Sequence, residues 1–176
     1  MRKKNDTVKR IVFVVCITLT VAWMMVIFGF SSNDAQESTA QSHTVTEIII
    51  RIFNRDFDNM TQVEQEAMVS EFDGIVRKIA HFIAYAVLGF LMYFSLSLVP
   101  FVHHTNIYKP IILSLPLSIL FAATDEYHQT FVSGRAGRFS DILIDSCGAL
   151  CGTLFALAVM SIAIRMMMDS KNKRGL

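Results

Sequence analysis

Apolar residues gather into four long runs along the chain, and polar stretches separate these runs. An α-helix needs about 20 predominantly apolar residues to cross the roughly 30 Å hydrocarbon core of a bilayer. The four runs cover residues 11–30, 79–102, 107–124 and 142–164. We therefore predict an all-α membrane protein with four transmembrane helices, one for each run.

Two of the runs allow a second interpretation. Residues 11–30 follow a basic start, as in a signal peptide, but they form a core of twenty uncharged residues and end in FGFSS, a poor cleavage site. A retained anchor helix is therefore favoured over a cleaved signal. The third run is the weakest span, because it contains Pro110 and Pro116. A membrane helix tolerates proline when groups such as Ser114 or Ser118 satisfy the freed backbone atoms.

A helical period also appears in residues 31–78, between the first two spans. Its apolar positions recur at i, i+3, i+4, i+7 and i+8, which is typical of an amphipathic helix on a membrane surface or over a bundle. These positions are Val45, Ile48, Ile49, Ile52 and Phe53. A second helix is predicted to start at Thr61, because Glu64 completes a capping box. Residues 54–59 form the break, and the second helix would enter the next span directly or bend at Gly74.

Composition and charge support this class and set an orientation. The chain has 176 residues, of which 53% are hydrophobic and 18% charged, and its mean hydropathy is +0.46. Lysine and arginine in short tails mark the cytoplasmic side. The tails 1–10 and 165–176 hold five and four such residues, so both are predicted to be cytoplasmic, on either side of one membrane domain at 11–164. The link 101–109 would then lie inside.

The segment 31–78 and the polar stretch 124–145 would lie outside. Nine Asp or Glu residues fall between Asp34 and Asp73, so the outer segment is acidic. The formal net charge of +1 is thus the sum of a basic inside and an acidic outside. It gives no support for a nucleic-acid partner, and the expected partner is the lipid bilayer.

The cysteines and the glycines of the fourth span suggest structural roles. Cys16, Cys147 and Cys151 form no CxxC or Cys/His zinc pattern, so we expect free thiols and neither a metal nor another cofactor. Gly148 and Gly152 form a small-xxx-small motif, which predicts a packing notch for another helix. The sequence leaves the oligomeric state open.

Polar side chains meet at the outer ends of the last three spans. Lys78, His81 and Tyr85 are spaced three and four residues apart, so they form one stripe on a helix. Under the predicted orientation this stripe enters from the same side as the stretch 124–145, TDEYHQTFVSGRAGRFSDILID. The polar residues of that stretch are Asp125, Glu126, His128, Gln129, Arg135, Arg138, Asp141 and Asp145. The sequence therefore predicts one polar layer built from several helix ends.

Burial should force these groups to pair. An ionised side chain near the bilayer centre costs roughly 2.5 to 3.5 kcal/mol, so such residues turn inward. We expect Lys78 or Arg135 to form ion pairs with carboxylates, and Tyr85 and Gln129 to donate further hydrogen bonds. The candidate carboxylates are Glu126, Asp141 and Asp145. An ion-pair network that only holds the outer loop is the structural alternative to a functional site.

The ordered motifs resemble the VanZ-like family of bacterial membrane proteins over about residues 30–152. They are FSS after the first span, then KIAHFIAYAVLG, DEYHQTF, a Gly-Arg pair, and DILIDSCGALCG. The resemblance implies a polar motif at Lys78, His81, Tyr85, Glu126, Gln129, Arg135, Asp141 and Asp145. Ser133 stands where the family often has proline, and Asp145 where it often has asparagine. An amide at the second position argues against an obligatory charged base there.

The resemblance implies an envelope protein of the bacterial cytoplasmic membrane that lowers susceptibility to teicoplanin-type lipoglycopeptides. The favoured class is an accessory binding protein, in which Lys78 and Arg135 hold an anionic lipid, a lipid-linked cell-wall precursor or the lipoglycopeptide. The runner-up is a membrane enzyme on such substrates, with His81 and Glu126 as acid-base groups and Asp141 as a further catalytic candidate. A small transporter using Asp145 and His81 as a proton relay is the third class.

Overall fold

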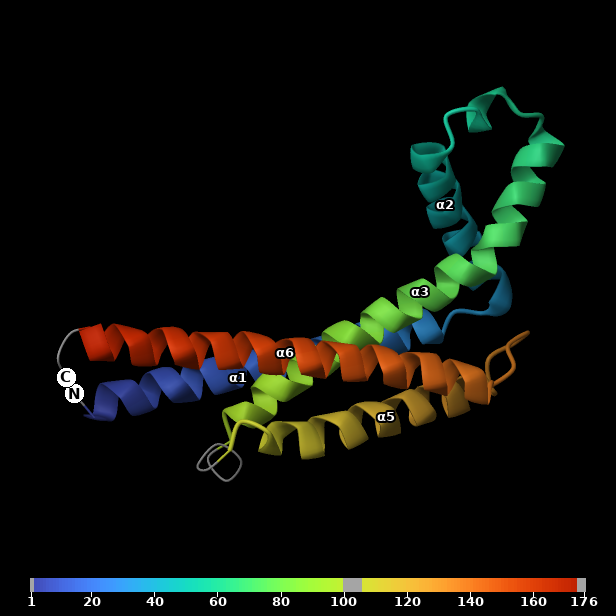
Figure 1. Ribbon diagram of the computed structural model, residues 1–176. Helices are drawn as coiled ribbons and strands as arrows, with labels where there is room; N and C mark the ends of the chain where they lie inside the picture. Colours follow the sequence, from blue (N-terminus) through green and yellow to red (C-terminus); the bar gives the residue numbers. More distant parts are fainter. Residues whose placement is uncertain (1, 100–105, 174–176) are drawn as a thin grey trace.

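The computed structural model describes residues 2–99 and 106–173, and within these ranges all regular structure is helical (Figure 1). The elements are α1 Arg2–Ser31, α2 Ala35–Phe53, the short 3-10 helix η1 Phe57–Asn59, α3 Gln62–Ser97, α5 Lys109–Gln129 and α6 Phe139–Lys173. This agrees with the predicted all-α class. Residues 100–105 hold the end of the second predicted span and most of the predicted inner link, and they lie outside the described residues.

The helices α1, α3, α5 and α6 pack into an elongated bundle (Figure 1). The start of α1 and the end of α6 lie together at one end of it, and the α5–α6 loop lies at the other, which we call the distal end. The segment formed by α2, η1 and the first part of α3, residues 35–73, projects sideways there. We call this segment the outer hairpin.

Three described helices are long and apolar enough to cross a membrane, over Thr7–Ser31, Gln62–Ser97 and Phe139–Asn172. The helix α5 is not among them; it contains Pro116 and carries charged residues at both ends. It nevertheless packs against α3 and α6. The structure thus supports the membrane class, whereas the four-span count and the cytoplasmic termini stay predictions.

The helix α3 starts at the predicted residue. The Thr61 hydroxyl accepts a hydrogen bond from the Glu64 backbone N–H at 3.4 Å, and the Glu64 carboxylate accepts one from the Thr61 N–H at 2.8 Å. These two bonds form the capping box that the sequence predicts. The helix then runs unbroken through Gly74 to Ser97, which is the uninterrupted alternative of the two that we considered.

The helix α2 begins ten residues before the predicted apolar stripe. Asp34 is its N-cap, and the Asp34 side chain accepts a hydrogen bond from the Glu37 N–H at 2.8 Å. The helix ends at Phe53, so the predicted break after it is present. Its buried residues are Thr46 and Ile50, whereas the five residues of the predicted stripe stay largely exposed.

Close contact between α3 and α6 determines how the bundle packs. A Cβ atom on Gly152 would stand 1.7 Å from the Ala86 carbonyl oxygen, and one on Gly148 would stand 2.2 Å from that of Phe82. Only glycine permits this approach of two helix backbones, as in small-xxx-small membrane packing. The predicted packing notch is therefore present, and it fixes the height at which α6 crosses α3.

Candidate functional site

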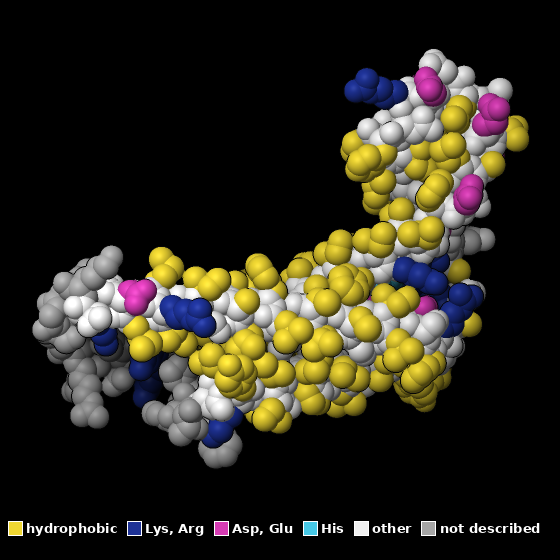
Figure 2. Space-filling model, viewed as in Figure 1, with side chains coloured by type: hydrophobic (Ala, Val, Ile, Leu, Met, Phe, Trp, Pro, Cys, Tyr) yellow, Lys and Arg dark blue, Asp and Glu magenta, His cyan; other side chains and the backbone are white. Residues whose placement is uncertain are grey.

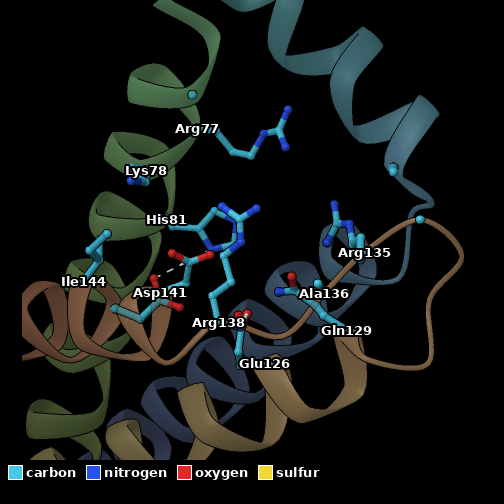
Figure 3. Close-up of a pocket in the computed structure, with 14 residues that line it drawn as sticks. Arg77, Lys78, His81, Glu126, Gln129, Arg135, Ala136, Arg138, Asp141 and Ile144 are labelled. Atoms are coloured by element: carbon cyan, nitrogen blue, oxygen red, sulfur yellow. Dashed lines mark hydrogen bonds and ion pairs between the residues drawn. The ribbon is translucent and has the colours of Figure 1, made fainter.

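A cavity of about 210 Å³ opens at the distal end of the bundle, among α3, the start of α6 and the loop that joins α5 to α6 (Figure 3). The first residue of α2, Ala35, also lines it. Its polar lining residues are Arg77, Lys78, His81, Glu126, Gln129, Arg135, Arg138, Asp141 and Asp145. Segments far apart in the sequence therefore contribute charged groups to one small space.

Seven of the eight residues predicted for the site line this cavity. They are Lys78, His81, Glu126, Gln129, Arg135, Asp141 and Asp145. The eighth, Tyr85, is fully buried in the bundle core. Its hydroxyl donates to Oδ2 of Asp125 at 3.3 Å, and the amide of Gln129 donates to the same oxygen at 3.4 Å. Tyr85 thus holds a buried carboxylate and is not itself in the lining.

His81 of α3 lies beside Asp145 of α6, and the two form an ion pair when the imidazole is protonated. Their Nδ1 and Oδ1 atoms are 3.7 Å apart, and Asp145 is fully buried while about a third of the His81 side chain is exposed. Neither carboxylate oxygen of Asp145 has a hydrogen-bond partner among the described residues. Asp145 is therefore buried next to His81, whose imidazole is exposed enough to contact a molecule in the cavity.

Glu126 organises the loop between α5 and α6. Its Oε1 atom accepts a hydrogen bond from the backbone N–H of Arg138 at 2.5 Å, and the residue is almost fully buried. Within this loop Gly134 has φ +73°, a backbone conformation that residues other than glycine rarely adopt. The turn directs Arg135 back towards α1, where its Nη1 donates to the Ser31 carbonyl oxygen at 3.0 Å.

Arg77 is a cavity residue that the sequence analysis did not include. Its Nη2 atom contacts the carboxylate of Asp73 at 2.8 Å, and it also donates to the hydroxyls of Ser42 at 3.2 Å and Thr39 at 3.4 Å. Arg77 therefore links α3 to α2 at the cavity edge. Its position four residues before His81, on the same helix face, was the signal that could have identified it.

The predicted ion pairs of Lys78 and Arg135 are wrong. In the described part of the chain, neither cation lies within ion-pair distance of a carboxylate, and the same holds for Arg138. Asp145 lies beside His81 instead, and the Glu126 carboxylate accepts a hydrogen bond from a backbone N–H. The reason is local geometry. The register of α3 against α6 places His81 next to Asp145, and the turn of the α5–α6 loop places the Arg138 N–H next to Glu126.

The arginines border the cavity from different sides. Figure 3 shows the guanidinium groups of Arg135 and Arg138, both from the α5–α6 loop, beside the cavity, whereas that of Arg77 extends from α3 towards α2. Burial, followed by the nearby positive charge of Arg77, lowers the pKa of Arg135 below its usual value. The carboxylates of Asp125, Glu126 and Asp34 act in the opposite direction, so acidic groups lie near this cation as well.

Two other predicted polar residues lie elsewhere. His128 does not line the cavity, because its ring packs on Phe28 of α1 with 4.4 Å between centroids. Asp125 is buried beneath the lining, where Tyr85 and Gln129 hold it. Arg138, a polar residue of the stretch 124–145 that was not among the eight predicted for the site, is a lining residue.

The chemistry open to this arrangement is anion binding and proton exchange. Three arginines and a lysine can hold phosphate or carboxylate oxygens. A partly exposed imidazole with a carboxylate behind it can accept or donate a proton. Among residues 2–99 and 106–173, no group of three or more His, Cys, Asp or Glu side chains is arranged to hold a metal ion.

Comparison with known proteins gives one match. A family model described as VanZ/LLP1 matches residues 16–161, a range that contains every residue lining the cavity. No curated protein and no solved structure matches the chain.

Proposed function

The chain belongs to the VanZ/LLP1 family, and from this premise we propose that it is an accessory protein of the bacterial cell envelope that binds an anionic headgroup in its distal cavity. The observation that carries the proposal is the set of cations without carboxylate partners, Lys78, Arg135 and Arg138, around one cavity. An arginine presents several N–H donors in one plane and a lysine a compact positive charge, so such side chains around one cavity can together hold the oxygens of an anion.

The size of the cavity limits what can enter it. Ligand sites for whole drug-sized molecules usually measure roughly 300 to 1,000 Å³, whereas this one measures about 210 Å³. A lipoglycopeptide would place only a small part of itself there. The charged lining also disfavours an acyl chain, because buried charges facing hydrocarbon lose their polar partners. The phosphate-bearing headgroup of a lipid or of a lipid-linked cell-wall precursor fits best.

The predicted orientation puts this cavity at the outer leaflet of the cytoplasmic membrane. Lipid-linked cell-wall precursors are displayed there, and lipoglycopeptides act on that side. A protein that holds such a headgroup would lower susceptibility to teicoplanin-type antibiotics by changing how the antibiotic or its target is presented. The charge pattern of the two tails supports this orientation.

Loss of antibiotic protection in cavity variants tests the proposal. Arg135→Ala and Glu126→Gln should abolish lipoglycopeptide protection in cells while the amount of protein in the membrane stays unchanged. Arg55→Ala is the matched control, because Arg55 does not line the cavity. Retained protection in both cavity variants would exclude the cavity as the site.

A membrane enzyme is the second candidate, and the His81–Asp145 pair favours it. In that function His81 exchanges protons with a bound lipid-linked substrate, Glu126 and Asp141 are the nearby carboxyl groups, and Arg135 stabilises developing negative charge. Incubating the purified protein with labelled lipid-linked precursor separates the two functions. A product that disappears in His81→Ala favours the enzyme, and stoichiometric binding without a product favours the accessory protein.

A further inference from the structure

The outer hairpin is a folded unit with a small core of its own. Ile50 of α2, Phe57 of η1 and Val69 of α3 are buried together, and Phe57 is almost completely enclosed. The side-chain amide of Gln65 donates to the carbonyl oxygens of Phe57 at 2.9 Å and Met60 at 3.2 Å, which closes the turn. The helices of the hairpin are therefore held together by contacts of their own.

One side of α2 is apolar and uncovered. Its residues are Val45, Ile48, Ile49, Ile52 and Phe53, with exposed fractions that reach 68% for Ile52 and 85% for Phe53. Large apolar side chains grouped in this way on a rigid helix mark a surface that contacts something else.

The opposite side of α2 is charged. Arg51 forms an ion pair with Glu47 at 2.7 Å and a second one with Asp58 at 3.3 Å. At 3.6 residues per turn, Glu47 and Arg51 lie roughly opposite the centre of the apolar stripe. The helix therefore has one face suited to hydrocarbon and one suited to water.

The helix α3, which is long and apolar enough to cross a membrane, also has an exposed apolar side. Exposed apolar residues follow one side of α3 from the hairpin into the bundle, at Phe72, Ile75, Ile79 and Ile83. Figure 1 shows α2 running across the long axis of the bundle at its distal end. Figure 2 shows hydrophobic side chains on the hairpin flank that faces back along the bundle, while acidic side chains gather towards its outer edge.

We propose that the outer hairpin lies flat on the bilayer at the distal end, with the stripe of α2 inserted among the upper parts of the lipid acyl chains. A helix that crosses the bundle axis at the level of the bilayer surface has the geometry of an interfacial helix. Binding rests on apolar contact, because the segment around the stripe is acidic and anionic headgroups would repel it. The occupant of the stripe is therefore the lipid surface.

This placement also sets the depth of the cavity. Ala35, the first residue of α2, lines the cavity, and Arg77 bonds to Thr39 and Ser42 of the same helix. A hairpin inserted at the boundary between headgroups and acyl chains would hold the mouth of the cavity near the level of the lipid phosphates. The inference does not depend on what the cavity binds.

Fluorescence quenching by brominated lipid tests the inference. The full-length chain with Ile52→Trp is reconstituted in phosphatidylcholine vesicles whose acyl chains carry bromine near the headgroup. Glu66→Trp is the matched control, because Glu66 is exposed on the hairpin outside the apolar stripe. The natural chain supplies the Trp23 emission to be subtracted. The emission added by Ile52→Trp should fall by about twofold or more relative to unbrominated vesicles, as for a residue at the headgroup and acyl-chain boundary, and that of Glu66→Trp should hardly change.

Equal quenching at the two positions would overturn the proposal. A second copy of the chain is the other possible occupant of the stripe. Ile52→Cys would then form disulfide-linked dimers under mild oxidation in the same vesicles, and the tryptophan at that position would stay unquenched. Because Ile52 is mostly exposed, neither substitution removes a buried contact, and elution as a single species in detergent checks that the variants are folded.

Discussion

Nδ1 of His81 lies 3.7 Å from Oδ1 of Asp145, and this contact joins α3 to α6, whose backbones meet at Gly148 and Gly152. Asp145 is fully buried, and His81 is its only ion-pair partner among the described residues. Removing one partner of a buried ion pair leaves the other uncompensated, which costs far more than the pair contributes.

His81→Ala should therefore lower the free energy of unfolding by about 3 kcal/mol. Adding Asp145→Asn to this variant should restore most of the loss, because the uncompensated charge disappears. Thermal unfolding of the purified proteins in detergent measures both effects. His43→Ala is the control, since no ion pair involves His43 among the described residues. A double variant that is no more stable than His81→Ala would contradict the interpretation.

Alanine at Gly152 should separate α3 from α6. The new Cβ would stand 1.7 Å from a backbone oxygen, which cannot move without the helix. We expect a loss of about 3 kcal/mol or failure to fold, at the upper end of overpacking costs. Gly29→Ala is the control, because it meets nothing within 4 Å. It should be neutral or stabilise by roughly 0.5 to 1 kcal/mol, the usual gain for alanine over glycine within a helix. Equal unfolding temperatures for the two variants would show that the helices do not cross in this way.

Lys78→Gln should weaken binding of anionic lipid by about tenfold, because one charge-assisted hydrogen bond contributes roughly 1.5 kcal/mol or more. Lys78 lines the cavity and has no carboxylate partner in the described part of the chain, so its loss leaves no buried acid unpaired. Titration of phosphatidylglycerol into protein in detergent, followed by native mass spectrometry, measures the change. Arg55→Gln changes net charge equally but lies outside the lining, so it should bind normally. Equal weakening in both variants would indicate a general charge effect and no specific site.

Thr61→Ala should loosen the start of α3 without changing the cavity. The substitution removes the N-cap hydroxyl of the capping box, a loss of about 1 kcal/mol. Amide hydrogen exchange should become faster in residues 62–66 and stay unchanged around Asp145. Thr44→Ala serves for comparison, because that hydroxyl bonds only to a carbonyl oxygen within α2. Unchanged exchange at 62–66 would mean that the cap does not hold the helix end.

Much of this arrangement follows from local patterns. Helical period and capping predicted where the hairpin helices lie and where α3 begins at Thr61, since these depend on neighbours within one or two turns. The convergence of Lys78 with Arg135 in one layer followed from the orientation rule combined with span ends. Both kinds of inference need only spacing and charge.

The individual partners could not be predicted in the same way. Arg77 binds Thr39 and Ser42, which depends on how α2 docks on α3. Glu126 bonds to a backbone N–H in a turn whose shape requires a positive φ at Gly134. Such partners are set by tertiary packing and backbone conformation, and residue spacing carries little information on either.

Cysteine labelling tests the predicted orientation. Ser133 is exposed in the α5–α6 loop and Asn172 is exposed near the other end of the bundle. Ser133→Cys should react with a membrane-impermeant maleimide in intact cells, and Asn172→Cys only after permeabilisation. The natural chain, with its cysteines in α1 and α6, provides the blank. The reverse pattern would place the cavity in the cytoplasm.

The unbroken course of α3 has a mechanical consequence. From Gln62 to His81 the helix extends about 28 Å, at 1.5 Å per residue, without an intervening loop. One continuous helix therefore carries both the outer hairpin, at its first turns, and His81, beside the crossing with α6. A displacement of the hairpin would also displace Arg77 at the cavity edge, because no loop separates the two.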